Sequence, residues 1–84
     1  MAMDLQSRIK EAVLSVSTQA EANPDVDEAL FESGILDSFA LADLVAALEK
    51  EFGVQVSDAD LRPKNFSSIR QIESYLQSHG VQPA

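Results

Sequence analysis

Residues 34–52 read GILDSFALADLVAALEKEF, and this stretch decides the fold. Its apolar side chains recur at steps of three and four residues, and its alanines favour helix. That spacing places the apolar side chains on one face of a helix. Gly53 follows directly, where a left-handed residue commonly ends a helix. The sequence therefore predicts an amphipathic helix over residues 38–52, with an apolar face of Leu41, Leu44, Val45, Leu48 and Phe52.

The same spacing predicts two further helices. The first covers residues 4–20, and its apolar face comprises Leu5, Ile9, Ala12, Val13 and Val16. The last helix is expected to begin at a cap formed by Ser67 or Ser68 and to end before Gly80. Its apolar face comprises Ile69, Ile72, Tyr75 and Leu76.

The connections between these helices differ in character. Pro24, Gly34 and several acids make the first connection a long loop. Apolar side chains in this loop indicate that it is pinned onto the core, and they are Leu30, Phe31, Ile35 and Leu36. In the second connection, Val54 and Val56 alternate too briefly for a sheet. Ser57 is expected to cap a short helical turn through Leu61, and Pro63 to stop its extension.

These elements predict an all-α fold. The expected architecture is a four-helix bundle of three main helices and a short third helix, with a long first loop. A length of 84 residues indicates one domain over residues 1–84. We expect its core at about residues 4–79 and a frayed tail at residues 80–84. Since a ligand pocket occupies roughly 300–1,000 Å³, a self-contained enzyme is not expected in so small a chain.

Composition excludes several classes of function. The chain contains no cysteine, so disulfides, thiolate metal sites and cysteine nucleophiles are excluded, and a cytoplasmic location is the simpler expectation. The net charge of −8 repels phosphate backbones and anionic lipids, so nucleic acid is not an expected partner. The charge attracts proteins with basic patches, although solubility alone also explains it. We expect no membrane span and no signal peptide.

The sequence offers no catalytic or metal-binding pattern of its own. His79 is the one histidine, and a Ser–His–Asp triad would require it to reach Ser38. No G-x-S-x-G elbow is present. The acids of DVDEALFESGILD lack the glycine and the final glutamate of a calcium-binding EF-hand loop. We therefore expect no catalytic residue and no metal site, and interpret His79 as an exposed residue at a helix end.

A more specific signal runs from residue 31 to residue 56, as FESGILDSFALADLVAALEKEFGVQV. An apolar-rich loop ends in glycine, two apolar residues and D-S, and L-x-x-L-x-x-x-L-E-x-x-F-G follows. This pattern resembles the core of the acyl carrier protein and peptidyl carrier protein superfamily, and the helical layout extends the resemblance over almost the whole chain. The later segment DADLRPKNFSSIRQIESYL looks like stand-alone carriers, nearest to D-alanyl carriers and free-standing peptidyl carriers.

The resemblance implies that Ser38 carries a 4′-phosphopantetheine arm, whose thiol holds acyl or aminoacyl groups as thioesters. It also implies that a phosphopantetheinyl transferase attaches the arm from coenzyme A with Mg²⁺, so Ser38 needs no local histidine. Asp37 is then the acid that the transferase recognises. From physical chemistry alone, both residues are good N-caps. A phosphodiester on Ser38 would also be favourable beside a helix N-terminus.

By the same resemblance, partner enzymes are contacted by Phe39, Asp43, Glu49 and Glu51. The implied partners are an adenylating or acyl-activating ligase and downstream acyl or condensing enzymes with basic docking patches. Without the resemblance, the acids are a solvated helix face and Phe39 is a core residue at the helix start. Lys50 and Ala40 depart from the pattern of fatty-acid carriers and point away from that pathway.

Two other interpretations stay open. One is an unmodified acidic helical interaction module with a carrier-like fold, which loading of an arm on Ser38 would separate from a carrier. The other is a calcium sensor, which the missing loop ligands disfavour. The cargo is also open among amino acids, fatty acyl chains and polyketide intermediates, because partner enzymes select it. We expect the chain to be a monomer.

Overall fold

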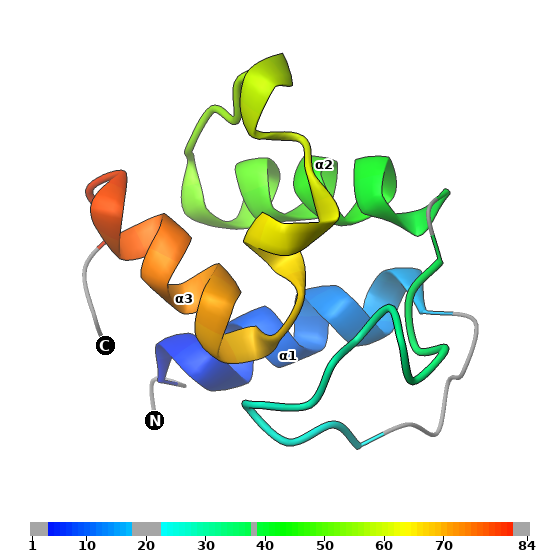
Figure 1. The fold of residues 1–84 in the computed structure, drawn as a ribbon. Coiled ribbons are helices and arrows are strands. Elements are labelled where there is room, and N and C mark those ends of the chain that lie inside the picture. Colours follow the sequence, from blue (N-terminus) through cyan, green and yellow to red (C-terminus); the bar gives the residue numbers. More distant parts are fainter. Residues whose placement is uncertain (1–3, 18–22, 38, 82–84) are drawn as a thin grey trace.

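The computed structural model describes residues 4–17, 23–37 and 39–81. Within them it contains three α-helices, which are α1 (Leu5–Val16), α2 (Ala40–Phe52) and α3 (Ile69–Ser78). Figure 1 shows α2 above α1, with α3 at the left and the long first loop at the lower right. No helix in these residues is long and apolar enough to cross a membrane. The predicted all-α fold is confirmed, since the described residues contain no strand.

The core is formed by the facing sides of the three helices and by the first loop. The predicted helix faces account for most of it, and Leu44 and Leu48 of α2 are completely buried. Leu41 and Phe52 differ from the prediction because they are only half-buried at its edge. Fully burying one large apolar side chain, such as that of Leu44, stabilises a fold by roughly 1.5–3 kcal/mol. In a chain of 84 residues, a few apolar side chains therefore decide stability.

The first helix is shorter than predicted. It ends at Val16 because Ser17 adopts an extended conformation, with ψ at 148°. The Ser17 hydroxyl donates to the carbonyl oxygen of Ile35 at 2.7 Å, which directs the chain toward the loop. Residues 18–20 lie outside the described residues. At the other end, Oδ1 of Asp4 accepts the amide of Ser7 at 2.7 Å, and this bond lowers the pKa of the Asp4 carboxyl.

The short third helix is replaced by two 3₁₀ turns, η1 (Asp58–Asp60) and η2 (Pro63–Phe66). Ser57 precedes η1 as predicted, but its side chain makes no capping hydrogen bond. The turn η2 differs from the prediction, because Pro63 was expected only to stop a helix. Proline also suits the first position of a helical turn, where its missing N–H leaves no partner unsatisfied. The turn buries Phe66, whose ring lies 5.3 Å from that of Tyr75.

The last helix begins and ends as predicted. Ser68 is its N-cap, and its hydroxyl accepts the amide of Gln71 at 3.1 Å. Gly80 follows the helix with φ at 93°, in the left-handed region that glycine tolerates best. The amide of Val81 donates to the carbonyl oxygen of Leu76 at 3.0 Å. Gly80 and Val81 therefore differ from the expected frayed tail, and residues 82–84 lie outside the described residues.

The first loop is pinned onto the bundle. Leu30, Ile35 and Leu36 are buried among the helices, as the sequence predicts, while Phe31 is half-buried against the same core. Backbone hydrogen bonds fasten the loop to the last part of the chain. The amide of Leu30 donates to Ser67, and that of Arg70 to Val26, each at 2.8 Å. The loop is thus a structural layer that determines where α2 begins.

Replacing Leu30 with alanine tests this role of the loop. We expect Leu30→Ala to lower the free energy of unfolding by about 2–5 kcal/mol, because it removes a completely buried side chain and leaves a cavity. Urea unfolding followed by circular dichroism measures the change. The control Glu32→Ala alters an exposed residue of the same loop and is expected to shift stability by less than about 0.5 kcal/mol. A similar, small loss in both variants would contradict a pinned loop.

Candidate functional site

Asp37 caps the start of α2. Its Oδ1 accepts the amide of Ala40 at 2.8 Å, and its carbonyl oxygen lies 3.1 Å from the same nitrogen. This bond satisfies a helix-end donor. The helix α2 begins at Ala40, two residues later than predicted, and Phe39 directly before it makes no side-chain capping bond. The side chain of Asp37 thus accepts an amide at the helix start, as a capping side chain does, although the residue directly before α2 is Phe39. Asp37 lies at the surface. Ser38 itself lies outside the described residues.

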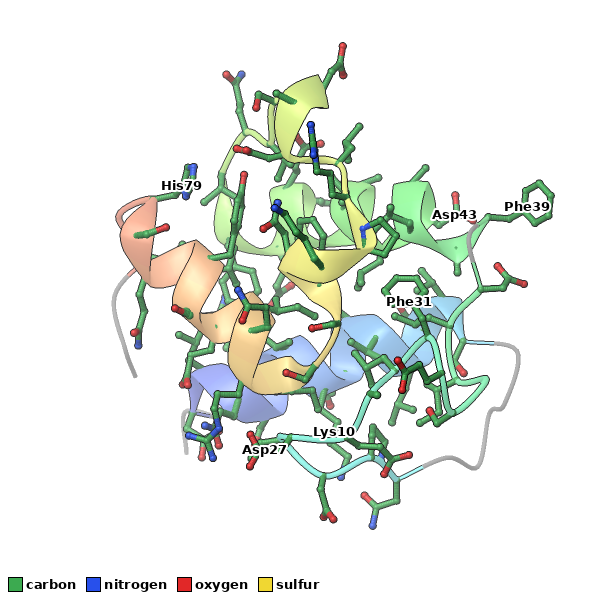
Figure 2. The ribbon with its side chains drawn as sticks, viewed as in Figure 1. Lys10, Asp27, Phe31, Phe39, Asp43 and His79 are labelled. Atoms are coloured by element: carbon green, nitrogen blue, oxygen red, sulfur yellow. The ribbon has the colours of Figure 1, made fainter. Side chains whose placement is uncertain are left out.

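Phe39 points away from the protein. It is 85% exposed, and Figure 2 shows its ring directed into solvent beyond the start of α2. The alternative that Phe39 is a core residue is therefore wrong. Among the described residues it is the large apolar side chain left exposed. An exposed aromatic ring contributes little to folding, but it is well placed to contact another molecule.

The acids of α2 have different surroundings. Asp43 is exposed in the first turn, on the same end of the helix as Phe39 (Figure 2). Glu51 pairs with Arg8 of α1, whose Nη2 lies 3.2 Å from its Oε1. Glu49 is half-buried, and its Oε2 accepts the amide of Val56 at 2.8 Å. The structure thus places Asp37, Phe39 and Asp43 together, and places Glu49 and Glu51 toward the other end of α2.

The described residues around this end of α2 include no histidine. His79 lies after α3, on the opposite side of Figure 2 from Phe39. It is exposed at a helix end, as predicted. Among the described residues, no three histidine or acidic side chains lie close enough together to hold a metal ion.

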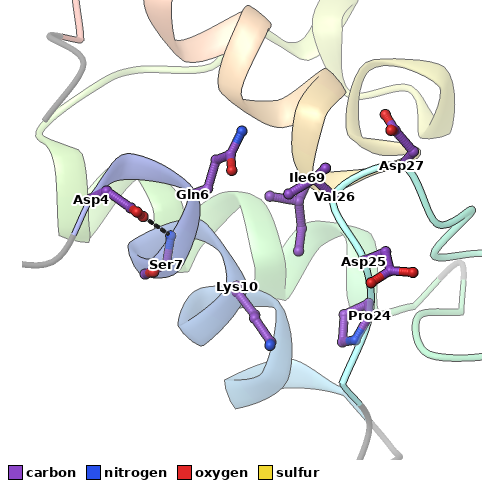
Figure 3. A pocket seen from close by; sticks show the side chains of 9 residues that line it. All are labelled: Asp4, Gln6, Ser7, Lys10, Pro24, Asp25, Val26, Asp27 and Ile69. Atoms are coloured by element: carbon purple, nitrogen blue, oxygen red, sulfur yellow. Dashed lines mark hydrogen bonds between the residues drawn. The ribbon is translucent and has the colours of Figure 1, made fainter.

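A hollow of about 500 Å³ lies elsewhere, between α1 and the beginning of the first loop (Figure 3). Its charged side chains are largely engaged in local contacts. Asp4 caps α1, and Asp27 pairs with Arg70 through oxygen Oδ2 and nitrogen Nη2, 3.2 Å apart. The hydrogen bond from Arg70 lowers the pKa of the Asp27 carboxyl. Figure 2 shows Asp27 well away from Phe39, so this hollow is separate from the start of α2.

One protein family matches most of the chain. A family described as the phosphopantetheine attachment site matches residues 7–76, which include all three α-helices in large part. The chain belongs to this family. Its members carry phosphopantetheine as a covalently attached group, so the predicted cofactor and the predicted carrier superfamily are confirmed.

Curated carrier proteins match the chain over most of their length. A D-alanyl carrier protein of Leuconostoc mesenteroides is 26% identical over 76 residues, or 90% of this chain and 96% of that protein. An acyl carrier protein of Thermotoga maritima is 32% identical over 74 residues, which cover 88% of this chain and 89% of that protein. A D-alanyl carrier protein of Bacillus licheniformis is 30% identical over 76 residues, which cover 88% of this chain and 95% of that protein. No solved structure matches significantly. The chain is therefore a carrier protein, and it is similar both to D-alanyl carrier proteins and to an acyl carrier protein.

The described residues fit a phosphopantetheine arm at the start of α2. Asp37 and Phe39 are both exposed, so a transferase can approach the chain at this point. The amino end of a helix of 13 residues carries partial positive charge, which favours a phosphodiester. When attached, the group supplies a thiol that forms thioesters with cargo.

Two contacts near the end of α2 could not be read from the sequence. Glu49 was expected on the docking face, yet it holds the chain after α2 through the Val56 amide. Asp60 lies in the predicted short helical turn, and its Oδ2 accepts the Tyr75 hydroxyl at 2.9 Å. Both contacts depend on how the segment after Gly53 folds back, which no local pattern indicates. The sequence offered one partial signal for the Glu49 contact, which is that this glutamate lies one turn before Gly53, the glycine that ends α2.

Substitutions of Asp37 separate its cap from its charge. Asp37→Ala is expected to cost about 0.5–2 kcal/mol of stability, because the Ala40 amide loses its side-chain acceptor. Asp37→Asn keeps an oxygen acceptor and is expected to remain within about 0.5 kcal/mol of the wild type. Urea unfolding measures both. Equal stability of the alanine variant and the wild type would show that the cap contributes nothing.

Proposed function

We propose that the chain bears a 4′-phosphopantetheine arm on Ser38 and shuttles acyl or aminoacyl groups as thioesters between partner enzymes. The observation that carries this proposal is the D-S-F sequence at an exposed helix start in a chain of the phosphopantetheine family. Ser38 directly follows the capping residue Asp37. In this proposal the chain acts as a single carrier domain without catalytic residues, and partner enzymes perform the chemistry.

The nature of the partners follows from the family. Carriers of this kind interact with a transferase that attaches the arm and with ligases that load it. For this chain we propose an adenylating ligase that loads an aminoacyl group, because D-alanyl carrier proteins are among its relatives. The net charge of −8 favours partners with basic docking patches. The lack of cysteine agrees with work in the cytoplasm.

Loading of the arm tests the proposal. We expect the intact mass of the purified chain to rise by one phosphopantetheine group on incubation with coenzyme A, Mg²⁺ and a broad-specificity transferase. Ser38→Ala is expected to abolish the gain and to keep the helical circular dichroism of the wild type. Ser33→Ala is a matched control, since it changes another exposed serine of the same segment and should load normally.

The possible outcomes separate the interpretations. Loading of Ser38→Ala would move the attachment residue elsewhere. No loading of a folded wild type, beside an active control carrier, would favour the unmodified interaction module. The loading rate of Asp37→Asn then tests whether the transferase recognises the charge of Asp37. Slower loading of this folded, capped variant supports contact between the Asp37 charge and the transferase, and an unchanged rate contradicts it.

We also propose that Phe39, Asp43, Glu49 and Glu51 form the docking surface, with Phe39 as its apolar anchor. Phe39 is 85% exposed, and Asp43 lies exposed on the same end of α2. Glu51 is already paired with Arg8, and Glu49 with a backbone amide, so both have a second role within the fold. An interface would therefore depend most on the end of α2 where the arm is attached.

Replacing Phe39 tests the docking anchor. We expect Phe39→Ala to lower kcat/KM of the loading ligase by about tenfold, because truncated aromatic anchors commonly cost more than about 1.4 kcal/mol of binding. The stability of the variant should be unchanged, since the ring is exposed. Gln71→Ala changes an exposed residue of α3 and serves as the control. Equal kcat/KM for Phe39→Ala and wild type would remove Phe39 from the interface.

A further inference from the structure

A small hollow lies between the first loop and η2, apart from the hollow of Figure 3. Its volume is about 230 Å³, and its lining residues are Ala29, Phe31, Glu32, Pro63, Lys64 and Ser67. None of these residues lines the larger hollow beside α1. Ligand pockets commonly measure roughly 300–1,000 Å³, so this hollow suits a small fragment rather than a whole metabolite. Ala29, Phe31 and Pro63 give it an apolar surface.

Backbone contacts hold the two walls of the hollow in place. On the loop side, the amide of Ser33 donates to the carbonyl oxygen of Ala29 at 2.9 Å. On the other side, Pro63 begins η2, and its ring fixes the first backbone angle of that turn. The amide of Leu30 donates to the carbonyl oxygen of Ser67 at 2.8 Å and joins the two walls. A site that is formed before binding loses little conformational entropy when a ligand enters.

Two charged side chains of opposite sign belong to the lining. Glu32 comes from the loop wall and Lys64 from the η2 wall, and both are exposed. Neither takes part in the ion pairs found within residues 4–17, 23–37 and 39–81. The carboxylate of Glu32 can therefore accept hydrogen bonds from a cation, and the ammonium group of Lys64 can donate to a carbonyl oxygen of the same ligand.

An aminoacyl thioester carries the groups that this lining would recognise. Its free ammonium group lies one carbon away from the thioester carbonyl, and a small side chain such as methyl adds apolar surface. Because the two charges of the hollow lie on different walls, the ammonium group can face Glu32 while the carbonyl oxygen faces Lys64. An acyl chain of the same length lacks the cation, so Glu32 gains no partner from it.

The hollow adjoins the segment that leads to the attachment residue of the arm. The amide of Leu36 donates to the carbonyl oxygen of Leu30 at 2.9 Å, which brings the loop wall against the residues just before Ser38. In Figure 2, Phe31 of the hollow lies on the same side of the molecule as Phe39. A cargo tethered at Ser38 has a high effective concentration beside the hollow, so a weak site is enough.

We propose that this hollow receives the aminoacyl group of the loaded arm, with Glu32 binding the free ammonium group and Lys64 the thioester carbonyl oxygen. The inference rests on the proposed function, because it requires the arm on Ser38. It adds a preference for small cargo that keeps a free amino group. Since the ion pair with Glu32 is exposed to solvent, we expect it to raise the ratio of docked to free cargo by about 1.5- to 5-fold.

NMR of the loaded chain tests the hollow. The arm is transferred from two coenzyme A analogues in which a stable amide replaces the thioester, one bearing alanyl and the other propionyl. These cargoes differ in the ammonium group alone, and intact mass verifies each loading. We expect the backbone amide shifts of Glu32, Ser33 and Lys64, measured relative to the chain with the arm alone, to be about 1.5- to 5-fold larger with alanyl than with propionyl.

Two variants assign the effect to Glu32. Glu32→Gln keeps the size of the side chain and removes its charge, so the advantage of alanyl over propionyl should disappear. Asp25→Asn removes an exposed acid of the same loop that does not line the hollow, so the advantage should remain.

The contrary outcomes are distinguishable. Failure to load would overturn the proposed function and this inference with it. Successful loading with no shift at these amides, or with shifts that are equal for both cargoes or larger with propionyl, would overturn the inference and leave the carrier function standing. An advantage of alanyl that persists in Glu32→Gln would overturn the role of Glu32 as the residue that binds the ammonium group.

Discussion

The burial of the first loop is the constraint on which the rest of the structure depends. Leu30, Ile35 and Leu36 are placed among the helices, and the backbone of the same loop is hydrogen-bonded to Ser67 and Arg70. Because Leu36 is buried, the chain has to reach the surface at Asp37. The exposed start of α2, which the carrier function requires, is therefore a consequence of core packing in the preceding residues.

From this start, α2 has two separate roles. Its buried side joins the bundle through Leu44 and Leu48, and its exposed end presents Phe39 and Asp43. Toward its other end, the acids serve the fold, since Glu49 holds the Val56 amide and Glu51 pairs with Arg8. The charges of one helix face thus differ in purpose, and the contacts proposed for partner enzymes concentrate beside residue 38.

Most of the helical layout could be predicted from the sequence, because helix faces follow a local repeat and helix ends follow local caps. Gly53 and Ser68 are examples. The early end of α1 could not be predicted, since it depends on contact between Ser17 and the distant Ile35. The exposure of Phe39 could not be predicted either, because an apolar residue at a helix start can lie in the core or at the surface. The contacts of Glu49 and Asp60 also required the folded chain.

The measurement that tests the central claim most directly is tandem mass spectrometry of the chain as isolated from the cells that produce it. Trypsin releases Ser38 in the peptide from Glu11 to Lys50, which contains no internal lysine or arginine. The account predicts that this peptide loses a phosphopantetheine fragment on activation and that the modified position is Ser38. An unmodified peptide in cells with active carrier biosynthesis, or an arm on another serine, would contradict the account.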